Sequence, residues 1–344
     1  MDMNYREDLL HTQEQRQTYL DGIEKIIDQR QRAGENKRTE YVKNIFTDPE
    51  KYRRDFRKML GWPLVDRDES LEREVPVPKS VKLADEDGYS IYRMTFDVLD
   101  GLEMTGLYFE IHGDGKKPLV LVQHGGSGTP EAVSDIYGIK NNYNNMLARV
   151  IANGVHAFAP QVLLWKVEKY GIPYDRKEID ARLKRVGSSI TAIEIYAMIR
   201  ILNYFEKQDN VLNLGMVGMS YGGFYTLFLS AIDTRIKAAF SCSFFNARDA
   251  YPWIDWTWQN AAEIFDDAEI ACLVYPRKLC IEIGERDKLF DVRSGKRSFE
   301  RLQKLCADVG TDWVTFNTFD GVHEFALEDA SIKCVVDKLK SEFE

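Results

Sequence analysis

The sequence lacks long apolar runs and extended basic segments. No stretch approaches the roughly 20 apolar residues that cross a bilayer, and residues 1–31 are too rich in Glu, Asp, Gln and Arg to hold the apolar core of a secretory signal. The formal net charge of -9, without a Lys/Arg-rich run of the necessary length, argues against general nucleic-acid binding. We therefore expect a cytoplasmic protein that binds neither membrane nor nucleic acid.

Cysteine and histidine are also scarce, with five of each in the chain. The cysteines are odd in number and lie mostly among apolar residues, which is typical of reduced core thiols and not of a disulfide framework or a zinc site. The histidines are dispersed as well, so the sequence predicts no clustered metal site.

What is present is the composition of a globular protein. Apolar residues make up 44% and charged residues 29% of the chain, which excludes a mostly disordered one. A length of 344 residues allows one large α/β domain with an extension, or two ordinary domains.

The first part of the chain has the spacing of helices. Leu20, Ile23 and Ile27 recur at helical intervals, and a second segment opens with Asp48-Pro49 and stops at Gly61. We expect residues 1–74 to form an N-terminal helical extension, packed as an added layer.

From about residue 75 the pattern becomes that of an α/β domain, over residues 75–344. An antiparallel hairpin is indicated around Asp100-Gly101, and short apolar strands then alternate with helices. This alternation predicts a doubly wound, mainly parallel sheet whose ligands bind at the carboxyl ends of the strands. Two insertions, at about 161–187 and 244–268, interrupt it and are expected to act as a lid or pocket wall.

One of those strands runs into the glycine-rich turn at residues 218–222. The glycines let the backbone approach itself closely, so the hydroxyl of Ser220 should project above the sheet and stay reachable. A serine placed in this way is a candidate nucleophile.

A serine nucleophile needs a base and an orienting carboxylate, and both have candidates at strand ends. His323 follows the strand at 313–316 and is the candidate base. Asp287 follows the strand at 279–283 and is the preferred acid. Glu285 remains a competitor, whereas Asp291 more plausibly caps the next helix.

Oxyanion donors are expected from two backbone N–H groups. One belongs to Tyr221, directly after the nucleophile, and the other to Gly125 or Gly126 in the glycine turn that follows an earlier strand. A phosphate-binding loop is the poorer interpretation of that turn, because no Lys-Ser or Lys-Thr follows it.

Three tryptophans, Trp253, Trp256 and Trp258, lie close together in the second insertion. Their rings are candidates for binding a sugar or aromatic substrate. The alternative, which we favour for at least two of them, is that they pack the lid onto the body of the domain.

Together these segments resemble the α/β-hydrolase superfamily, and most closely its dienelactone-hydrolase-like and acetyl-xylan-esterase-like branch. The resemblance implies an α/β-hydrolase fold, with Ser220 as nucleophile, His323 as base and Asp287 as acid. Two features depart from the pattern. Dienelactone hydrolases proper have a cysteine where this chain has Ser220, and the N-terminal helical extension is an addition to the family's pattern.

The function implied by the resemblance is hydrolysis of a carboxylic ester through an acyl-enzyme, on a carbohydrate or small-molecule acetyl ester. No metal or organic cofactor is needed for any step. A prolyl-oligopeptidase-like peptidase and a non-catalytic ligand-binding protein stay open as alternatives, although the chain has no room for a propeller. The N-terminal helical extension could cover the active site or pair with a second subunit. A homo-oligomer therefore stays open as an alternative to a monomer.

Overall fold

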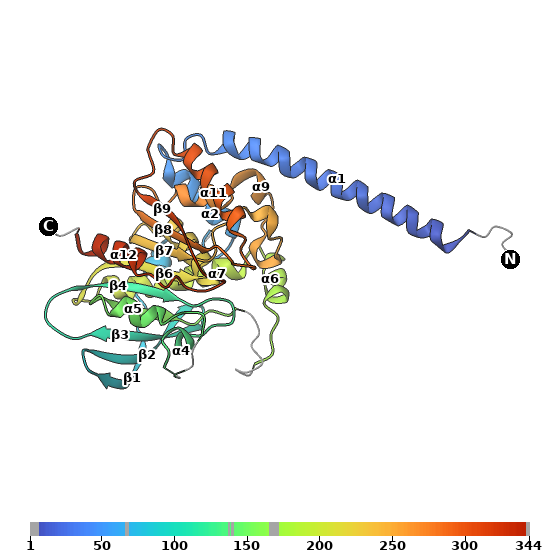
Figure 1. Ribbon diagram of the computed structural model, residues 1–344. Helices are drawn as coiled ribbons and strands as arrows, with labels where there is room; N and C mark the ends of the chain where they lie inside the picture. Colours follow the sequence, from blue (N-terminus) through green and yellow to red (C-terminus); the bar gives the residue numbers. More distant parts are fainter. Residues whose placement is uncertain (1–6, 66–68, 137, 139–140, 165–171, 342–344) are drawn as a thin grey trace.

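A computed structural model describes residues 7–65, 69–136, 138, 141–164 and 172–341 (Figure 1). In this part of the chain nine strands form one sheet, in the order β1-β2-β3-β5-β4-β6-β7-β8-β9. The strands are β1 (Lys79–Glu86), β2 (Tyr89–Leu99), β3 (Leu102–Ile111), β4 (Lys117–Gln123), β5 (His156–Pro160), β6 (Val211–Met219), β7 (Ile236–Cys242), β8 (Lys278–Gly284) and β9 (Val314–Phe319).

The sheet is antiparallel at one end and parallel in the rest. Strands β1, β2 and β3 pair antiparallel, β3 also pairs antiparallel with β5, and all pairs from β5 through β9 are parallel. The strand order reverses at β4, which lies between β5 and β6, and Gln123 pairs with Gly218. The turns after β4 and β6 are therefore neighbours at the carboxyl edge, where doubly wound sheets bind their ligands.

Helices cover both faces of the sheet. Buried residues of α5 and α12 pack on one face, and those of α7 and α8 on the other. The helices are α1 (Leu9–Tyr41), α2 (Pro49–Leu60), α3 (Glu69–Arg73), α4 (Pro130–Val133), α5 (Met146–Ile151), α6 (Arg176–Lys184), α7 (Ile190–Glu206), α8 (Tyr221–Ile232), α9 (Ala261–Ile264), α10 (Asp267–Cys272), α11 (Val292–Leu305) and α12 (Ala330–Ser341), with short 3₁₀ turns η2 (Arg248–Ala250) and η3 (Ile254–Trp256). None of the helices in the described ranges is both long and apolar enough to cross a bilayer.

The predicted doubly wound sheet is confirmed, and its strands lie where the apolar runs placed them. The residues of β4 from Pro118 to Gln123 are all buried, as expected for a strand covered on both faces. Strand β1 escaped prediction because it is an exposed edge strand without a clear apolar face.

The N-terminal helices differ from one another in packing. Helix α2 forms the expected layer: Phe56 is fully buried, with its ring 5.0 Å from that of Phe228. Helix α1 instead projects from the body (Figure 1), and Leu20, Ile23 and Ile27 are 48%, 38% and 41% exposed. The helical spacing of those residues predicted the helix correctly. It carries no information about what covers the helix face that they form.

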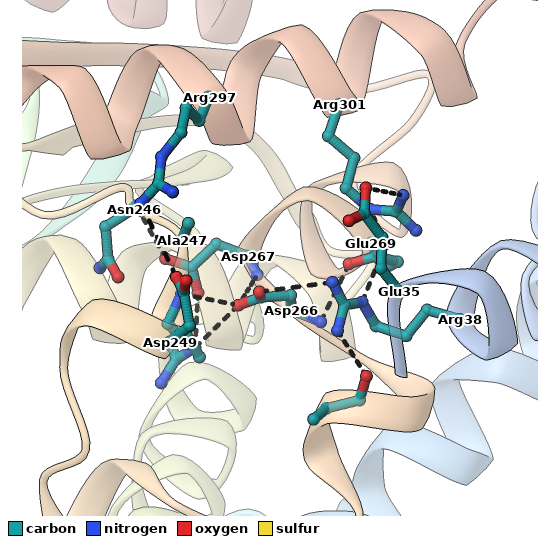
Figure 2. A network of polar contacts seen from close by, with 12 residues as sticks. Glu35, Arg38, Asn246, Ala247, Asp249, Asp266, Asp267, Glu269, Arg297 and Arg301 are labelled. Atoms are coloured by element: carbon teal, nitrogen blue, oxygen red, sulfur yellow. Dashed lines mark hydrogen bonds and ion pairs between the residues drawn. The ribbon is translucent and has the colours of Figure 1, made fainter. Parts of the chain in front are cut away.

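Residues in the C-terminal part of helix α1 anchor it to the body (Figure 2). The guanidinium of Arg38 donates to the carbonyl oxygen of Ala262 and lies 3.4 Å from Glu269 and 3.8 Å from Asp266. Arg301 of α11 donates to the same Glu269 carboxylate. Burial raises the pKa of Glu269, and the two guanidiniums oppose that rise. This ion-pair cluster joins α1 to α9, α10 and α11.

Candidate active site

Ser220 lies at the sharp turn between β6 and α8. Its φ of 60° and ψ of -123° are strained for a residue with a side chain. The N–H of Ser220 donates to the carbonyl of Cys242 at 2.8 Å. A Cβ at Gly222 would lie 2.0 Å from the carbonyl oxygen of Gln123, so only glycine lets α8 start this close to β4. The turn holds the hydroxyl at the carboxyl edge of the sheet.

The imidazole of His323 reaches this hydroxyl from the loop after β9. Its Nε2 lies 3.0 Å from Ser220 Oγ, and its Nδ1 lies 2.8 Å from Asp287 Oδ2. The structure thus brings together the predicted nucleophile, base and acid in hydrogen-bonding order. With Nδ1–H donating to the carboxylate, the neutral imidazole presents its Nε2 lone pair to the hydroxyl.

Asp287 is held rigidly in the loop after β8. Its Oδ1 accepts the backbone N–H groups of Leu289 at 2.8 Å and Phe290 at 2.9 Å. The side chain has no exposed surface. Because one carboxylate oxygen is fixed by the backbone, the other is aimed at the imidazole.

The two competing acids lie elsewhere. Glu285 is exposed, and its carboxylate accepts the hydroxyl of Thr318 at 2.8 Å. Asp291 caps α11 by accepting the N–H of Arg293 at 2.8 Å, as expected from the sequence. Among the three carboxylates only Asp287 contacts His323.

The loop that carries His323 is tied to the segment before α5. The side-chain amide of Asn142 donates to the His323 carbonyl at 3.1 Å, and the N–H of Phe325 donates to the Asn142 carbonyl at 2.8 Å. Ser243 supports the next residue by donating to the Glu324 carbonyl at 2.8 Å. These bonds fix the imidazole without using its ring nitrogens.

The two glycines predicted as oxyanion donors differ in their hydrogen bonding. The Gly125 N–H donates to the hydroxyl of Tyr143 at 2.7 Å and so already has an acceptor. No hydrogen bond of the Gly126 N–H is recorded within the described part of the chain. Tyr221, directly after the nucleophile, is the first residue of α8. Of the two predicted glycines, Gly126 is therefore the better candidate for the second backbone donor.

Beside this turn lies a buried histidine, His124. Its Nε2 faces two donors, the N–H of Val162 at 3.4 Å and the amide of Gln161 at 3.5 Å, while Nδ1 lies 3.0 Å from the Gly125 carbonyl. This arrangement fits a neutral ring that donates from Nδ1. Burial lowers the pKa of His124 from 6.5 to about 4.

The free energy of unfolding should therefore decrease at acid pH, because the buried His124 ring resists protonation. Between about pH 6.5 and 4 the unfolded chain binds a proton here that the folded chain does not, so this contribution is complete above 6.5 and decreases as the pH falls. We expect His124→Gln to reduce the slope of unfolding free energy in that window by up to about 1.4 kcal/mol per pH unit. Urea unfolding at several pH values measures the slope.

The matched control for this measurement is His112→Gln, which removes an exposed histidine and shows how far the slope changes when a histidine outside the core is replaced. A His124→Gln protein with an unchanged slope would show that the buried ring does not resist protonation.

A cavity of about 200 Å³ opens above Ser220 and His323. Most of its wall surface is apolar, with Met219 and Leu289 among the contributors, and the segment before α5 and α4 supply polar side chains. Besides Ser220 and His323, the residues with polar side chains in the wall are Ser127, Glu131, Asp135, Asn141, Asn142 and Tyr143. A small substrate group fits such a space, and polar side chains in the wall can form hydrogen bonds with the atoms beside that group.

The tryptophans do not line this cavity, so far as its walls are described. Trp256 and Trp258 are 2% and 6% exposed and belong to the core. The Trp256 ring stacks on Phe224 of α8 at 5.2 Å, and Trp253 stacks on Tyr221 at 6.1 Å. The alternative stated above, packing of the insertion onto the domain, is the one that fits this geometry. Trp256 and Trp258 are too buried to bind a substrate, and for the partly exposed Trp253 substrate binding stays a prediction.

Sequence reasoning missed a buried cluster behind the nucleophile. Arg176, 3% exposed, donates to Tyr225 at 2.7 Å, to Asp255 at 2.8 Å and to Glu194 at 3.0 Å. The same Asp255 carboxylate accepts the hydroxyl of Tyr221 at 2.7 Å. The cluster thereby fixes the side chain next to Ser220. No pattern could reveal it, because its members come from separate segments.

The sequence matches a known protein family, and the fold is similar to that of several solved structures. The sequence matches the Dienelactone hydrolase family over residues 132–337. Among curated proteins none matches the chain. The fold is similar to that of a candidate acetyl xylan esterase from Bacteroides fragilis NCTC 9343, at 19% identity, a TM-score of 0.62 and coverage of 78% of this chain and 75% of that chain.

Two further solved structures share the fold. Acetyl xylan esterase 1 from Thermoanaerobacterium sp. JW/SL YS485 is 15% identical, with a TM-score of 0.56 and coverage of 86% of this chain and 94% of that chain. A glucuronoyl esterase from Solibacter usitatus is 14% identical, with a TM-score of 0.56 and coverage of 79% and 87%. These similarities confirm the predicted α/β-hydrolase fold.

Proposed function

The chain belongs to the dienelactone hydrolase family and is a carboxylic ester hydrolase, and from that premise we propose that it cleaves its ester through an acyl-enzyme on Ser220. The observation that carries the proposal is the continuous hydrogen-bonded line from Ser220 Oγ through His323 to Asp287, with spacings of 3.0 and 2.8 Å. Each of the three residues makes the hydrogen bond that its catalytic role requires.

In the proposed mechanism Ser220 Oγ attacks the acyl carbon while His323 Nε2 takes the hydroxyl proton. The N–H groups of Tyr221 and Gly126 stabilise the oxyanion, and His323 then protonates the leaving alcohol. Water attacks the acyl-enzyme by the same path and releases the acid. Asp287 stays ionised throughout and holds the imidazole in the required tautomer.

The cavity favours a short acyl group on a polar alcohol. Its volume of about 200 Å³ is below the roughly 300–1,000 Å³ of pockets for drug-sized ligands, so a long acyl chain would not fit inside it. The carboxylate and amide groups of Glu131, Asp135 and Asn142 can bind hydroxyl groups of the alcohol. We therefore assign the substrate class as acetyl esters of carbohydrates or of similarly polar small molecules.

A substrate panel tests this assignment. Purified protein is assayed on acetyl, butyryl and octanoyl nitrophenyl esters, on acetylated xylo-oligosaccharides and on peptide amides. We expect kcat/KM to decrease by at least about tenfold from acetyl to octanoyl, since the cavity holds only the short chain, and peptide amides not to be cleaved. Faster cleavage of peptide amides than of acetyl esters would favour a peptidase instead, and a preference for octanoyl would contradict the assigned acyl group.

A further inference from the structure

The Tyr143 hydroxyl lies inside the glycine turn that follows β4. It accepts the Gly125 N–H at 2.7 Å, and a Cβ at Gly128 would lie 2.0 Å from the phenol oxygen. The turn is closed by the Gly128 N–H, which donates to the Gly125 carbonyl at 3.0 Å. A side chain at Gly128 would displace the hydroxyl, so the turn is shaped around this oxygen.

Tyr143 also borders the catalytic cavity. Tyr143 lines the cavity together with Ser220 and His323. The position that a Cβ would take on Gly125 lies 3.1 Å from Ser220 Cβ and 3.3 Å from Tyr143 Oη, so the nucleophile's side chain and the phenol oxygen both lie beside this one glycine. Within the described residues the hydroxyl accepts a hydrogen bond and donates none, which leaves its proton free for a substrate atom.

We infer that Tyr143 is a further catalytic residue, whose O–H donates a hydrogen bond to the oxyanion together with the N–H groups of Tyr221 and Gly126. The inference rests on the proposed function, because it assumes an oxyanion formed by attack of Ser220. It gives the Gly125 N–H a different task, which is to orient the phenol. The hydrogen bond from Gly125 also polarises the phenol and strengthens its donation.

The surroundings of Tyr143 suit a fixed donor. The residue is 5% exposed, its ring belongs to the core cluster on the α5 face of the sheet, and its N–H donates to Asn141 Oδ1 at 2.9 Å. Burial raises the pKa of Tyr143 far above its ordinary value, so the phenol keeps its proton at every pH at which the triad works. A donor that is oriented before the reaction needs no rearrangement when charge develops.

The test deletes only the hydroxyl, with Tyr143→Phe. Loss of one oxyanion donor lowers kcat by about 10²- to 10³-fold. We expect that decrease with acetyl esters, with KM within roughly threefold of wild type and an unchanged pH profile of kcat/KM, since His323 is untouched. A trifluoromethyl ketone, to which Ser220 adds to form a tetrahedral oxyanion, should lose affinity by a similar factor.

The matched control is Tyr52→Phe in α2. It removes another buried phenol, which donates to the Tyr41 carbonyl at 2.8 Å outside the cavity, and should leave kcat and ketone affinity at wild-type values. A kcat for Tyr143→Phe within roughly threefold of wild type would overturn the inference, as would a lower kcat with unchanged ketone affinity.

A second measurement serves if Tyr143→Phe fails to fold. In a crystal structure of the wild-type ketone adduct, the adduct oxygen should lie within about 3.0 Å of Tyr143 Oη, and a separation above about 3.5 Å would overturn the inference. Ser220→Ala keeps the two proposals apart. Activity in Ser220→Ala contradicts the proposed function, whereas an inactive Ser220→Ala beside a fully active Tyr143→Phe contradicts only the role of Tyr143.

Discussion

Replacing Ser220 with alanine is expected to lower kcat for an acetyl ester by about 10⁶-fold, to a residual rate set by the oxyanion donors and substrate binding alone. The serine oxygen forms the covalent bond to the acyl group, and alanine offers no atom in its place. KM should change little, because the hydroxyl contributes to bond formation more than to substrate binding. Steady-state kinetics with highly purified protein measures both quantities.

Ser230→Ala is the matched control for this substitution. Ser230 lies on the same helix, α8, and is fully buried, and its hydroxyl has no hydrogen-bond partner among the residues that the structure describes. Its removal should leave kcat unchanged. Comparable turnover by Ser220→Ala and Ser230→Ala would exclude Ser220 as the nucleophile.

The second large effect is expected at Asp287. Asp287→Asn should lower kcat by about 10⁴-fold. The amide oxygen can still accept the N–H groups of Leu289 and Phe290, but the amide nitrogen would then donate to His323 Nδ1 and force the proton onto Nε2. An imidazole in that tautomer has no lone pair for the Ser220 proton.

Glu285→Gln is the control that separates the two carboxylates. Glu285 is exposed and bonded to Thr318, so its replacement should keep kcat within roughly twofold of wild type. The pattern is measured with the same ester under the same conditions. Loss of activity in Glu285→Gln with a fully active Asp287→Asn would reverse the choice of acid.

The spatial grouping of Ser220, Asp287 and His323 could be predicted because parallel strands share one carboxyl edge. Each residue follows its own strand, β6, β8 or β9, and those strands are close neighbours in the sheet. Placement of a residue directly after a strand is therefore enough to bring it to this edge. The sequence favoured Asp287 but left Glu285 as a competitor, since that choice depends on how the loop after β8 turns.

Tyr143 was not predicted as a site residue, because it lies in an irregular segment before α5. Asn144 and Asn145 have positive φ angles of 49° and 56°, and α5 begins at Met146. Asparagine tolerates this left-handed conformation better than most residues, so the pair was a usable signal. The irregular segment turns the phenol into the glycine turn, which no periodicity could indicate.

The sequence also could not predict which surface of the protein packs against a given side chain or helix face. The tryptophans of the second insertion look alike in sequence, yet Trp256 and Trp258 pack in the core while Trp253 is partly exposed. In the same way the spacing of Leu20, Ile23 and Ile27 predicted a helix, but not that it would project from the body. Amphipathic patterns define a face, and the fold alone decides what contacts it.

The most direct test of the central claim is mass spectrometry of the wild-type protein after inactivation by a fluorophosphonate, which reacts with activated serine hydroxyls. If Ser220, His323 and Asp287 act as one unit, a single adduct should form on the peptide that contains Ser220, in proportion to the activity lost. Complete inactivation with Ser220 unmodified, or folded and active protein that takes up no label, would contradict the claim.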